Sequence, residues 1–214
     1  KSALIVIDVQ ESFTRRPYFS AADVPAYLAA QNRLIESFEA LGLPIVRVFH
    51  VSPGGDAGDA FALASGLVKP LEGLRHFTAA HEVHKTRHSA LVGTGLDVWL
   101  TQQGIGQIVV SGIRTEQCCE TTTRHASDLG WKVVFVPEAT LTFDMQLPDG
   151  SPFRAADIVA RTCSVLQGRF AQVRSVEDTL AHVLVDALVD NGHAHPFALP
   201  SAQVLATSLP VVSA

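Results

Sequence analysis

Residues 111–130, SGIRTEQCCETTTRHASDLG, mark the point where an apolar strand is expected to end and a helix to begin. They follow the short run QIVV at 107–110, and they close on a glycine, which commonly ends a helix. Two cysteines, Cys118 and Cys119, stand at the expected start of the helix. A strand, a short loop and a helix in this order form the repeating unit of a parallel α/β fold.

The same unit recurs along the chain. Apolar segments rich in β-branched residues predict strands at 3–8, 43–51, 107–112 and 132–139, with further candidates at 79–83 and 169–176. Helical spacing and glycine stops predict helices at 21–42, 94–104, 118–130, 153–168 and 176–192. We therefore expect a three-layer αβα fold with helices on both faces of a mainly parallel sheet.

The chain of 214 residues is long enough for one large core, and we expect a single domain over residues 1–192. A segment rich in Gly and Asp at 52–73 predicts a loop or lid over a site. Residues 193–214 form a C-terminal extension, either an arm that packs on a second subunit or a loose tail. Its Phe, Leu and Val residues favour the arm, and with it a homo-oligomer.

Composition excludes several classes of protein. The net charge of -5 comes without a basic stripe, so we expect no nucleic-acid partner. No apolar stretch approaches the roughly 20 residues of a membrane span, so we expect no membrane partner. The opening run KSALIVIDVQ is typical of a buried strand and not of a signal peptide. Three cysteines give no disulfide framework, which favours a reducing cytoplasm.

The two adjacent cysteines are expected to have different roles. The positive end of a helix favours a thiolate, so Cys118 in the first turn is a candidate nucleophile. Cys119 is rotated about 100° from it and is expected to face the core. That expected buried face also carries Thr122, Ala126 and Leu129. A thiol redox role for Cys118 is an alternative.

Two charged residues stand at expected strand ends, where open α/β sheets bind their ligands. Asp8 closes the first strand, and the partial burial expected there suits a general base, although an Asp that caps a turn explains the position equally well. Lys85 follows the candidate strand at 79–83 and would favour a nearby thiolate. Taken by its spacing alone, Lys85 belongs to a solvated polar cluster.

Three motifs, ALIVIDVQESF, HKTRHSALVGTGLDVWL and GIRTEQCCETTTRHASDLGWKVVFVPEAT, together resemble the isochorismatase-like cysteine hydrolases. That family includes nicotinamidases, N-carbamoylsarcosine amidase, ureidoacrylate hydrolases and isochorismatase. The resemblance runs from about residue 3 to residue 139, and GRFAQVRSVEDTLA at 168–181 looks like the closing strand and helix of the family. It implies a six-stranded, Rossmann-like sheet.

The resemblance also implies a set of active-site residues. Asp8, Lys85 and Cys118 match the catalytic acid, lysine and nucleophile of the family, while Leu91 replaces an aromatic residue that is usual there. A cis peptide bond is implied between Ile113 and Arg114. The oxyanion hole would then consist of the backbone N–H groups of Arg114 and Cys118.

Neither a metal nor a cofactor is expected. Nicotinamidases of the family have a zinc site after the second strand, formed by an Asp-x-His pair and a further histidine. Here FHVSPGGDAGDAF provides His50 without the paired pattern. The histidines at 81, 84 and 88 have metal-like spacing, but they flank Lys85 and are expected to point in different directions.

The implied activity is hydrolysis of a small amide or ureide C–N bond through a thioester. Vinyl-ether hydrolysis of the isochorismatase type and a catalytically silent binding subunit are the alternatives. Arg114 is expected either to bind a substrate carboxylate or to pair with Glu116 or Glu120. The other candidates for substrate contact are Phe13, Tyr18 and Phe143, although aromatic residues belong to the core more often than to a pocket.

Overall fold

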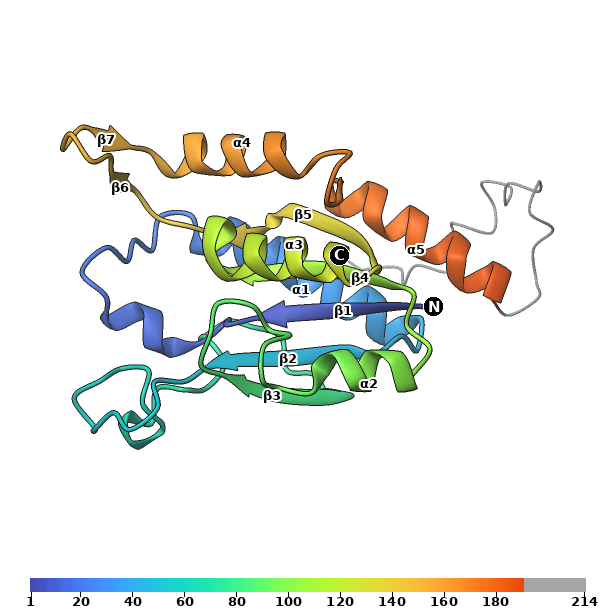
Figure 1. The fold of residues 1–214 in the computed structure, drawn as a ribbon, viewed down its shortest axis with the longest axis horizontal. Helices are drawn as coiled ribbons and strands as arrows, with labels where there is room; N and C mark the ends of the chain where they lie inside the picture. Colours follow the sequence, from blue (N-terminus) through green and yellow to red (C-terminus); the bar gives the residue numbers. More distant parts are fainter. Residues whose placement is uncertain (191–214) are drawn as a thin grey trace, which may run out of the picture.

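A computed structural model describes residues 1–190, which form a six-stranded parallel sheet flanked by helices (Figure 1). The strand order is β3-β2-β1-β4-β5-β8. The strands are β1 (Ser2–Ile7), β2 (Ile45–His50), β3 (His81–Lys85), β4 (Gln107–Ile113), β5 (Lys132–Leu141) and β8 (Gln172–Val173). All five strand pairings are parallel, so the carboxyl ends of the strands meet at one edge of the sheet.

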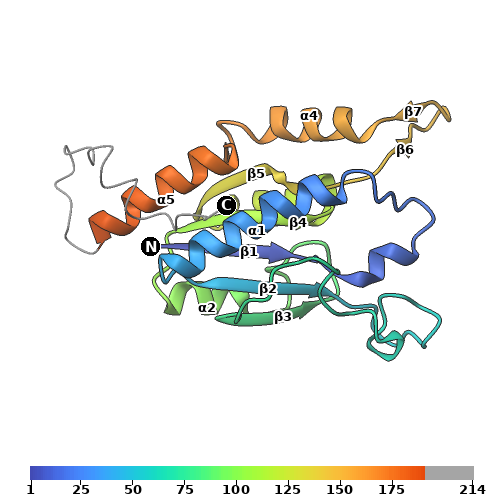
Figure 2. The same cartoon turned by 180° about the vertical axis from the view of Figure 1, so that it is seen from behind.

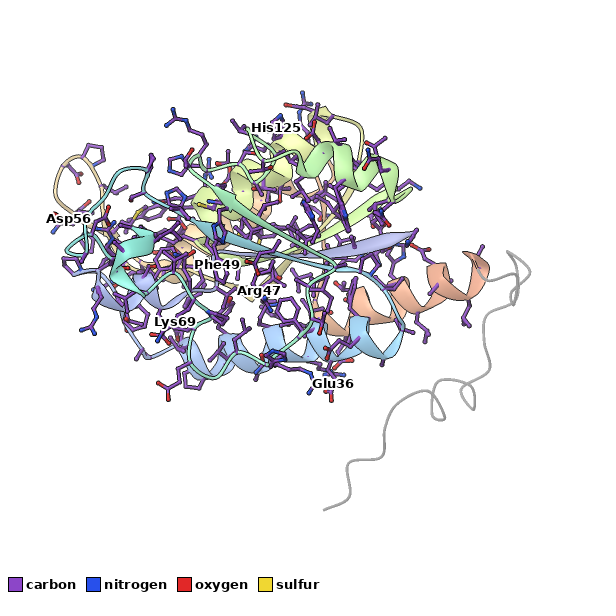
Figure 3. The ribbon with its side chains drawn as sticks, turned by 90° about the horizontal axis from the view of Figure 1, so that it is seen from below. Glu36, Arg47, Phe49, Asp56, Lys69 and His125 are labelled. Atoms are coloured by element: carbon purple, nitrogen blue, oxygen red, sulfur yellow. The ribbon has the colours of Figure 1, made fainter. Side chains whose placement is uncertain are left out.

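Helices cover both faces of this sheet. Two of them, α1 (Val24–Ala40) and α5 (Val176–Asp190), lie side by side on one face (Figure 2). The other face carries α2 (Leu96–Gln102) and α3 (Glu120–Asp128), and α4 (Ala155–Leu166) packs against α3. Figure 3, seen from below, places Glu36 of α1 and His125 of α3 on opposite sides of the sheet. The expected three-layer αβα architecture is therefore confirmed.

Alternation along the central strands fills two cores. In β1, Leu4 and Val6 contribute to the core beneath α1, whereas Ile5 and Ile7 contribute to the core beneath α2 and α3. All six residues of β1 are buried. Burial on both faces explains why this strand has an almost unbroken apolar sequence.

The sequence placed most elements within a few residues of their observed ends, and the differences are local. Only residues 172–173 of the candidate strand at 169–176 pair with the sheet, next to β5. A small hairpin of β6 (Met145–Gln146) and β7 (Pro152–Phe153) was not predicted. Thr122 and Ala126 share the buried face of Cys119, but Leu129 is 51% exposed because it follows the last turn of α3.

A glycine allows β1 and β4 to approach closely near their carboxyl ends. Gly112 has a φ of 128° and lies opposite Ile7 in the register of the two strands. A Cβ atom at this position would lie 2.0 Å from the Ile7 carbonyl oxygen. Only glycine fits there, and this contact fixes the end of β1 relative to the loop that follows β4.

The segment at 52–73 packs over the carboxyl end of β1. The backbone N–H of Glu11 donates to the Lys69 carbonyl, and the Leu71 N–H donates to the Val9 carbonyl, both at 3.0 Å. The segment includes the short helix η2 (Leu63–Ser65) and lies against η1 (Glu11–Arg15). Figure 3 places its Asp56 and Lys69 at this end of the molecule. Backbone hydrogen bonds thus hold the predicted loop against the end of the sheet.

Two further findings concern the described residues. No helix within residues 1–190 is both long enough and apolar enough to cross a membrane. The predicted C-terminal extension at 193–214 lies outside the residues that the structure describes.

A buried carboxylate joins α3 to α4. Glu120 accepts hydrogen bonds from Arg124 at 2.9 Å, from Arg161 at 2.5 Å and from the Thr162 hydroxyl at 3.2 Å. Its side chain is only 7% exposed. Because a buried carboxylate must keep its partners, this group ties α4 to the helix that begins at the end of η3 (Thr115–Cys119).

Replacing Glu120 by alanine is expected to lower the free energy of unfolding by about 2 kcal/mol, because three donors lose a charged acceptor. The melting temperature should fall by about 4–8 °C in a thermal scan. Arg154→Gln is the matched control, since it breaks an exposed pair with Asp144 and should cost at most about 0.5 kcal/mol. Equal shifts in the two variants would contradict a structural role for Glu120.

Candidate active site

Four neighbouring strands each bring one polar residue to the same edge of the sheet. Asp8 directly follows β1, His50 is the last residue of β2, and Lys85 is the last residue of β3. Cys118 lies in η3, the π-helical turn that follows β4. Because the order of these strands is β3-β2-β1-β4, the four side chains converge.

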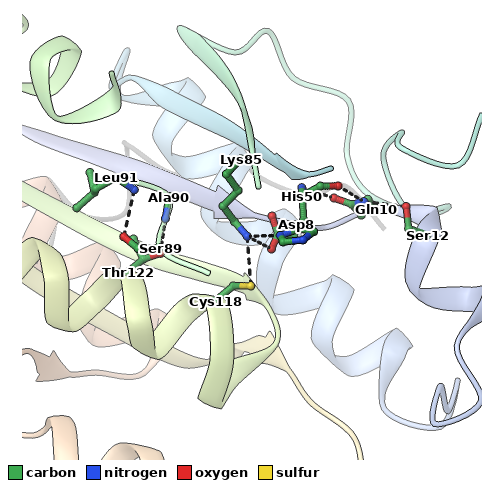
Figure 4. A network of polar contacts seen from close by, with 10 residues as sticks. All are labelled: Asp8, Gln10, Ser12, His50, Lys85, Ser89, Ala90, Leu91, Cys118 and Thr122. Carbon is green, nitrogen blue, oxygen red and sulfur yellow. Dashed lines mark hydrogen bonds and ion pairs between the residues drawn. The ribbon is translucent and has the colours of Figure 1, made fainter. Parts of the chain in front are cut away.

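Lys85 is the centre of this cluster (Figure 4). Its Nζ lies 2.7 Å from Oδ2 of Asp8, 3.0 Å from Nδ1 of His50 and 3.2 Å from Sγ of Cys118. The side chains of Asp8 and Lys85 are fully buried, and Cys118 is 6% exposed. A lysine ammonium has three N–H donors, and here each of them has an acceptor within reach.

The backbone at the end of β1 holds Asp8 in this position. Asp8 has a φ of 53°, in the left-handed region, where Asp is one of the few non-glycine residues that occur. Its N–H donates to the Val48 carbonyl at 2.8 Å, and its carbonyl accepts from the Gln10 N–H at 2.9 Å. These bonds turn the chain sharply and direct it into η1.

Burial dominates the protonation behaviour of the cluster. It raises the pKa of Asp8 above the usual range, although the Lys85 ammonium acts in the opposite direction. Burial by itself would lower the pKa of Lys85, but the combined effects of Asp8 and Cys118 outweigh it and hold that pKa above its usual value. The pair is therefore an ammonium beside a carboxylate whose basicity is increased.

Cys118 is a protonated thiol at neutral pH. Burial, followed by the nearby Asp8 carboxylate, raises the pKa of Cys118 to about 12, despite the opposing effect of Lys85. The sequence predicted a thiolate favoured by the helix start. Burial and the neighbouring Asp8 carboxylate act against that bias and favour the protonated thiol. A base is therefore needed to make this sulfur nucleophilic.

The loop before Cys118 has an unusual backbone. The peptide bond between Ile113 and Arg114 is cis. The Arg114 carbonyl accepts from the N–H groups of Gln117 and Cys119, both at 3.2 Å, which forms the π-helical turn. The assignment of the Arg114 and Cys118 N–H groups as an oxyanion hole stays a prediction.

The Arg114 guanidinium pairs with a neighbouring acid. Its Nη2 lies 3.0 Å from Oε1 of Glu116, and both side chains are at most 10% exposed. Thr142 donates to the same Glu116 carboxylate at 2.6 Å. Of the sequence alternatives, the structure thus favours the pair with Glu116. Pairing with Glu120 was wrong, because that carboxylate is held by the arginines of α3 and α4.

The three aromatic candidates for substrate contact do not lie together: two are next to Arg114, and the third packs elsewhere in the core. Tyr18 and Phe143 flank Arg114, whose guanidinium carbon lies 4.7 Å from the Tyr18 ring centroid and 5.8 Å from that of Phe143. Tyr18 is 38% exposed, whereas Phe143 is buried. Phe13 is also buried and packs edge-on against Phe61 at 5.0 Å. Tyr18 is thus the aromatic candidate that solvent reaches.

One group within residues 1–190 has the composition of a metal site. One potential ligand atom each from Asp8, His50 and Cys118 lies within 4.8 Å of the other two. The Lys85 ammonium contacts all three side chains, so a positive charge is already provided by the chain itself. A metal ion in this space would have to displace Lys85 and would meet its charge. The residues therefore do not fit a metal while Lys85 keeps this position.

Comparison with known proteins places this arrangement in a family. A family model described as "Isochorismatase domain" matches residues 2–167. The chain belongs to the isochorismatase family. The match contains all four strands that provide the cluster, and it includes Asp8, His50, Lys85 and Cys118.

Similar proteins support this assignment. YecD of Escherichia coli O157:H7, an uncharacterised family member, is 31% identical over 84% of this chain and 94% of its own length. Nicotinamidase 3 of Arabidopsis thaliana is 38% identical over 32% of this chain and 35% of its length. Streptothricin hydrolase of Streptomyces noursei is 29% identical over 67% of this chain and 50% of its length.

A solved structure shows the same fold in another isochorismatase family member. The putative isochorismatase of Burkholderia xenovorans LB400 superposes with a TM-score of 0.76 at 29% identity. The superposition covers 96% of this chain and 95% of that chain. Membership in the isochorismatase family, together with similarity to a nicotinamidase and a streptothricin hydrolase, identifies the chain as a member of a hydrolase family.

Sequence reasoning missed one member of the cluster in its observed role. His50 was weighed only as a metal ligand. The signal that could have found it is the one used for Asp8, namely a polar residue at the carboxyl end of an apolar strand. The sequence did not show that His50 pairs with Lys85 in the register of β2 and β3.

Proposed function

We propose that this chain is a cysteine-dependent hydrolase of a small amide or ureide C–N bond, with Cys118 as nucleophile and Asp8 as general base. The observation that carries the proposal is the position of the Lys85 ammonium, 2.7 Å from the Asp8 carboxylate and 3.2 Å from the Cys118 sulfur. The Asp8 carboxylate, whose pKa is raised, and the Cys118 thiol therefore both contact the same Lys85 ammonium. Relatives named as a nicotinamidase and a streptothricin hydrolase support an amide-type bond as the target.

The first half-reaction transfers an acyl group to sulfur. The Cys118 thiol proton passes to Asp8 as the sulfur attacks the substrate carbonyl carbon and a C–S bond forms. Lys85 stabilises the negative charge that appears on sulfur during this transfer. The tetrahedral oxyanion is bound by the backbone N–H groups of Arg114 and Cys118. The C–N bond then breaks, and the leaving amine takes the proton from Asp8.

The second half-reaction restores the enzyme. Asp8, again a carboxylate, takes a proton from water as the water oxygen attacks the thioester carbon. The C–S bond breaks, and the sulfur takes the proton back from Asp8. The products are an amine or ammonia and an acid. For a ureide, the acid is a carbamate.

The substrate has to accommodate the pair formed by Arg114 and Glu116. A substrate carboxylate that used Arg114 would have to displace Glu116, which lies 3.0 Å from the guanidinium. A neutral substrate needs no such displacement. We therefore propose a small amide or ureide that carries no carboxylate next to the reacting carbonyl, with Tyr18 at the exposed side of the site.

A screen for ammonia release tests the proposed function. The panel contains small neutral amides, ureides, the matched amides with an added carboxylate, and a vinyl ether as the control for the alternative reaction. We expect release from neutral amides or ureides and at least about tenfold less from their carboxylated partners, because the charged pair must open. Cleavage of the vinyl ether alone, or dithiol cycling with a reductant that persists in Asp8→Asn, would contradict the proposal.

A further inference from the structure

We infer that His50 is a positioning residue of the site: its Nδ1 accepts a hydrogen bond from Lys85 and fixes the ammonium between the base and the nucleophile. The inference rests on the proposed function, to which it adds a fourth residue. Its basis is the 3.0 Å contact between Lys85 Nζ and His50 Nδ1. The sequence motif FHVSPGGDAGDAF suggested His50 only as a metal ligand and not as a partner of Lys85.

The chemistry of the two groups fixes the direction of the hydrogen bond. An ammonium donates and cannot accept, so Nδ1 of His50 must carry the lone pair. The ring is then the neutral tautomer with its proton on Nε2. Burial, with the nearby charges of Lys85 and His88, lowers the pKa of His50 to about 4, so the ring is neutral at pH 7, as an acceptor requires.

His50 completes the set of acceptors around Lys85. Asp8 takes one N–H of the ammonium and Cys118 faces another, which leaves a third that would be unsatisfied in a buried space. A lysine side chain has a flexible four-carbon stem, so two contacts hold its ammonium less firmly than three. The third contact comes from the neighbouring strand β2 and further restricts the ammonium.

The backbone holds His50 independently of its ring. Its N–H donates to Oε1 of Gln10 at 2.8 Å, and its carbonyl accepts from Nε2 of Gln10 at 3.1 Å. The Gln10 amide also donates to the Ser12 hydroxyl at 2.7 Å (Figure 4). Because these bonds involve only the backbone of His50, a changed side chain at position 50 leaves them in place. Variants at this position therefore test the ring itself.

Two replacements separate the ring nitrogens. In His50→Asn, the side-chain oxygen lies near the place of Nδ1 and accepts a hydrogen bond. In His50→Gln, the oxygen lies near the place of Nε2. His50→Ala removes both. Only the asparagine variant should keep Lys85 in position.

The main measurement is the rate of alkylation of Cys118 by iodoacetamide at pH 8, which needs no substrate. The background is Cys119→Ala with Cys163→Ala, in which Cys118 is the remaining thiol of the chain. We expect alkylation to slow about three- to tenfold in His50→Ala and His50→Gln, because a loosened ammonium stabilises the thiolate less. His50→Asn should stay within about twofold of the parent.

Turnover provides the second measurement on any amide that the native chain cleaves. We expect kcat to fall about 10- to 100-fold in His50→Ala with KM within about twofold, because His50 acts through Lys85 and not on the substrate. His50→Asn should recover most of the loss. A KM that rises while kcat stays constant would assign His50 to substrate binding and overturn the inference.

Other outcomes also overturn it. Unchanged alkylation in His50→Ala would make the contact with Lys85 irrelevant to the sulfur. Rescue by His50→Gln and not by His50→Asn would assign the role to Nε2. Loss of alkylation or turnover on treatment with EDTA, restored by Zn²⁺, would make His50 a metal ligand. Failure of every amide, with alkylation as expected, would overturn the proposed reaction and leave the role of His50 intact.

Discussion

Replacing Cys118 by alanine is expected to reduce amide hydrolysis at least about 10³-fold, because the sulfur that forms the thioester is gone. The fold should persist, since the change removes one atom from a side chain at the edge of a packed core. Ammonia release and a trapped thioester, detected by mass spectrometry as an added acyl group on Cys118, are the measurements. In Cys118→Ala, both should be lost together.

The neighbouring cysteine provides the matched control. Cys119 is fully buried in the core beneath α2 and α3, and burial raises the pKa of its thiol well above the usual range. Cys119→Ala should therefore keep turnover within about threefold and cost about 1 kcal/mol of stability at most. Equal loss of activity in the two variants would contradict the choice of nucleophile, as would an acyl group found on Cys119.

Replacing Asp8 by asparagine is expected to change two measurements in opposite directions. Turnover should fall about 10²- to 10⁴-fold, because no group remains to accept the thiol proton. Alkylation of Cys118 should become faster, because Asp8 is one of the causes that raise the pKa of Cys118 to about 12. Each unit by which that pKa falls gives about tenfold more thiolate at a fixed pH below it.

The sign of the effect follows from charge. In the native chain, a thiolate would form beside a carboxylate, and the Lys85 ammonium is shared between the two. With asparagine in place of Asp8, Lys85 serves the sulfur alone. Asp128→Asn, an exposed position at the end of α3, is the control and should change neither measurement. Slower alkylation together with slower turnover in Asp8→Asn would show that Asp8 mainly maintains the site and would contradict its role as base.

The sequence predicted the architecture because its central strands are buried on both faces. An apolar run such as ALIVID can only be a strand inside a parallel sheet or a buried helix, and its length favours the strand. Short elements were harder to place. The strand β8 has two residues, and the hairpin of β6 and β7 pairs through two residues in each strand. Segments this short are too brief to show a hydrophobic periodicity in the sequence.

The positions of the site residues followed from a second rule, namely that ligands of open α/β sheets bind at the carboxyl ends of the strands. It located Asp8, Lys85 and Cys118, and the family resemblance assigned their catalytic roles. It could not give the contacts among them, because these depend on which strands are neighbours. Lys85 and His50 are 35 residues apart in the chain, and only the pairing of β2 with β3 brings them together.

The sequence by itself determined the α/β fold, the family and the strand ends that carry the chemistry, because periodicity and motif spacing are local properties of the chain. The tertiary structure alone decided the protonation of Cys118, the pairing of Arg114 with Glu116 and the place of His50 beside Lys85. These depend on burial and on charges that come from distant segments, and both quantities exist only after the sheet has assembled.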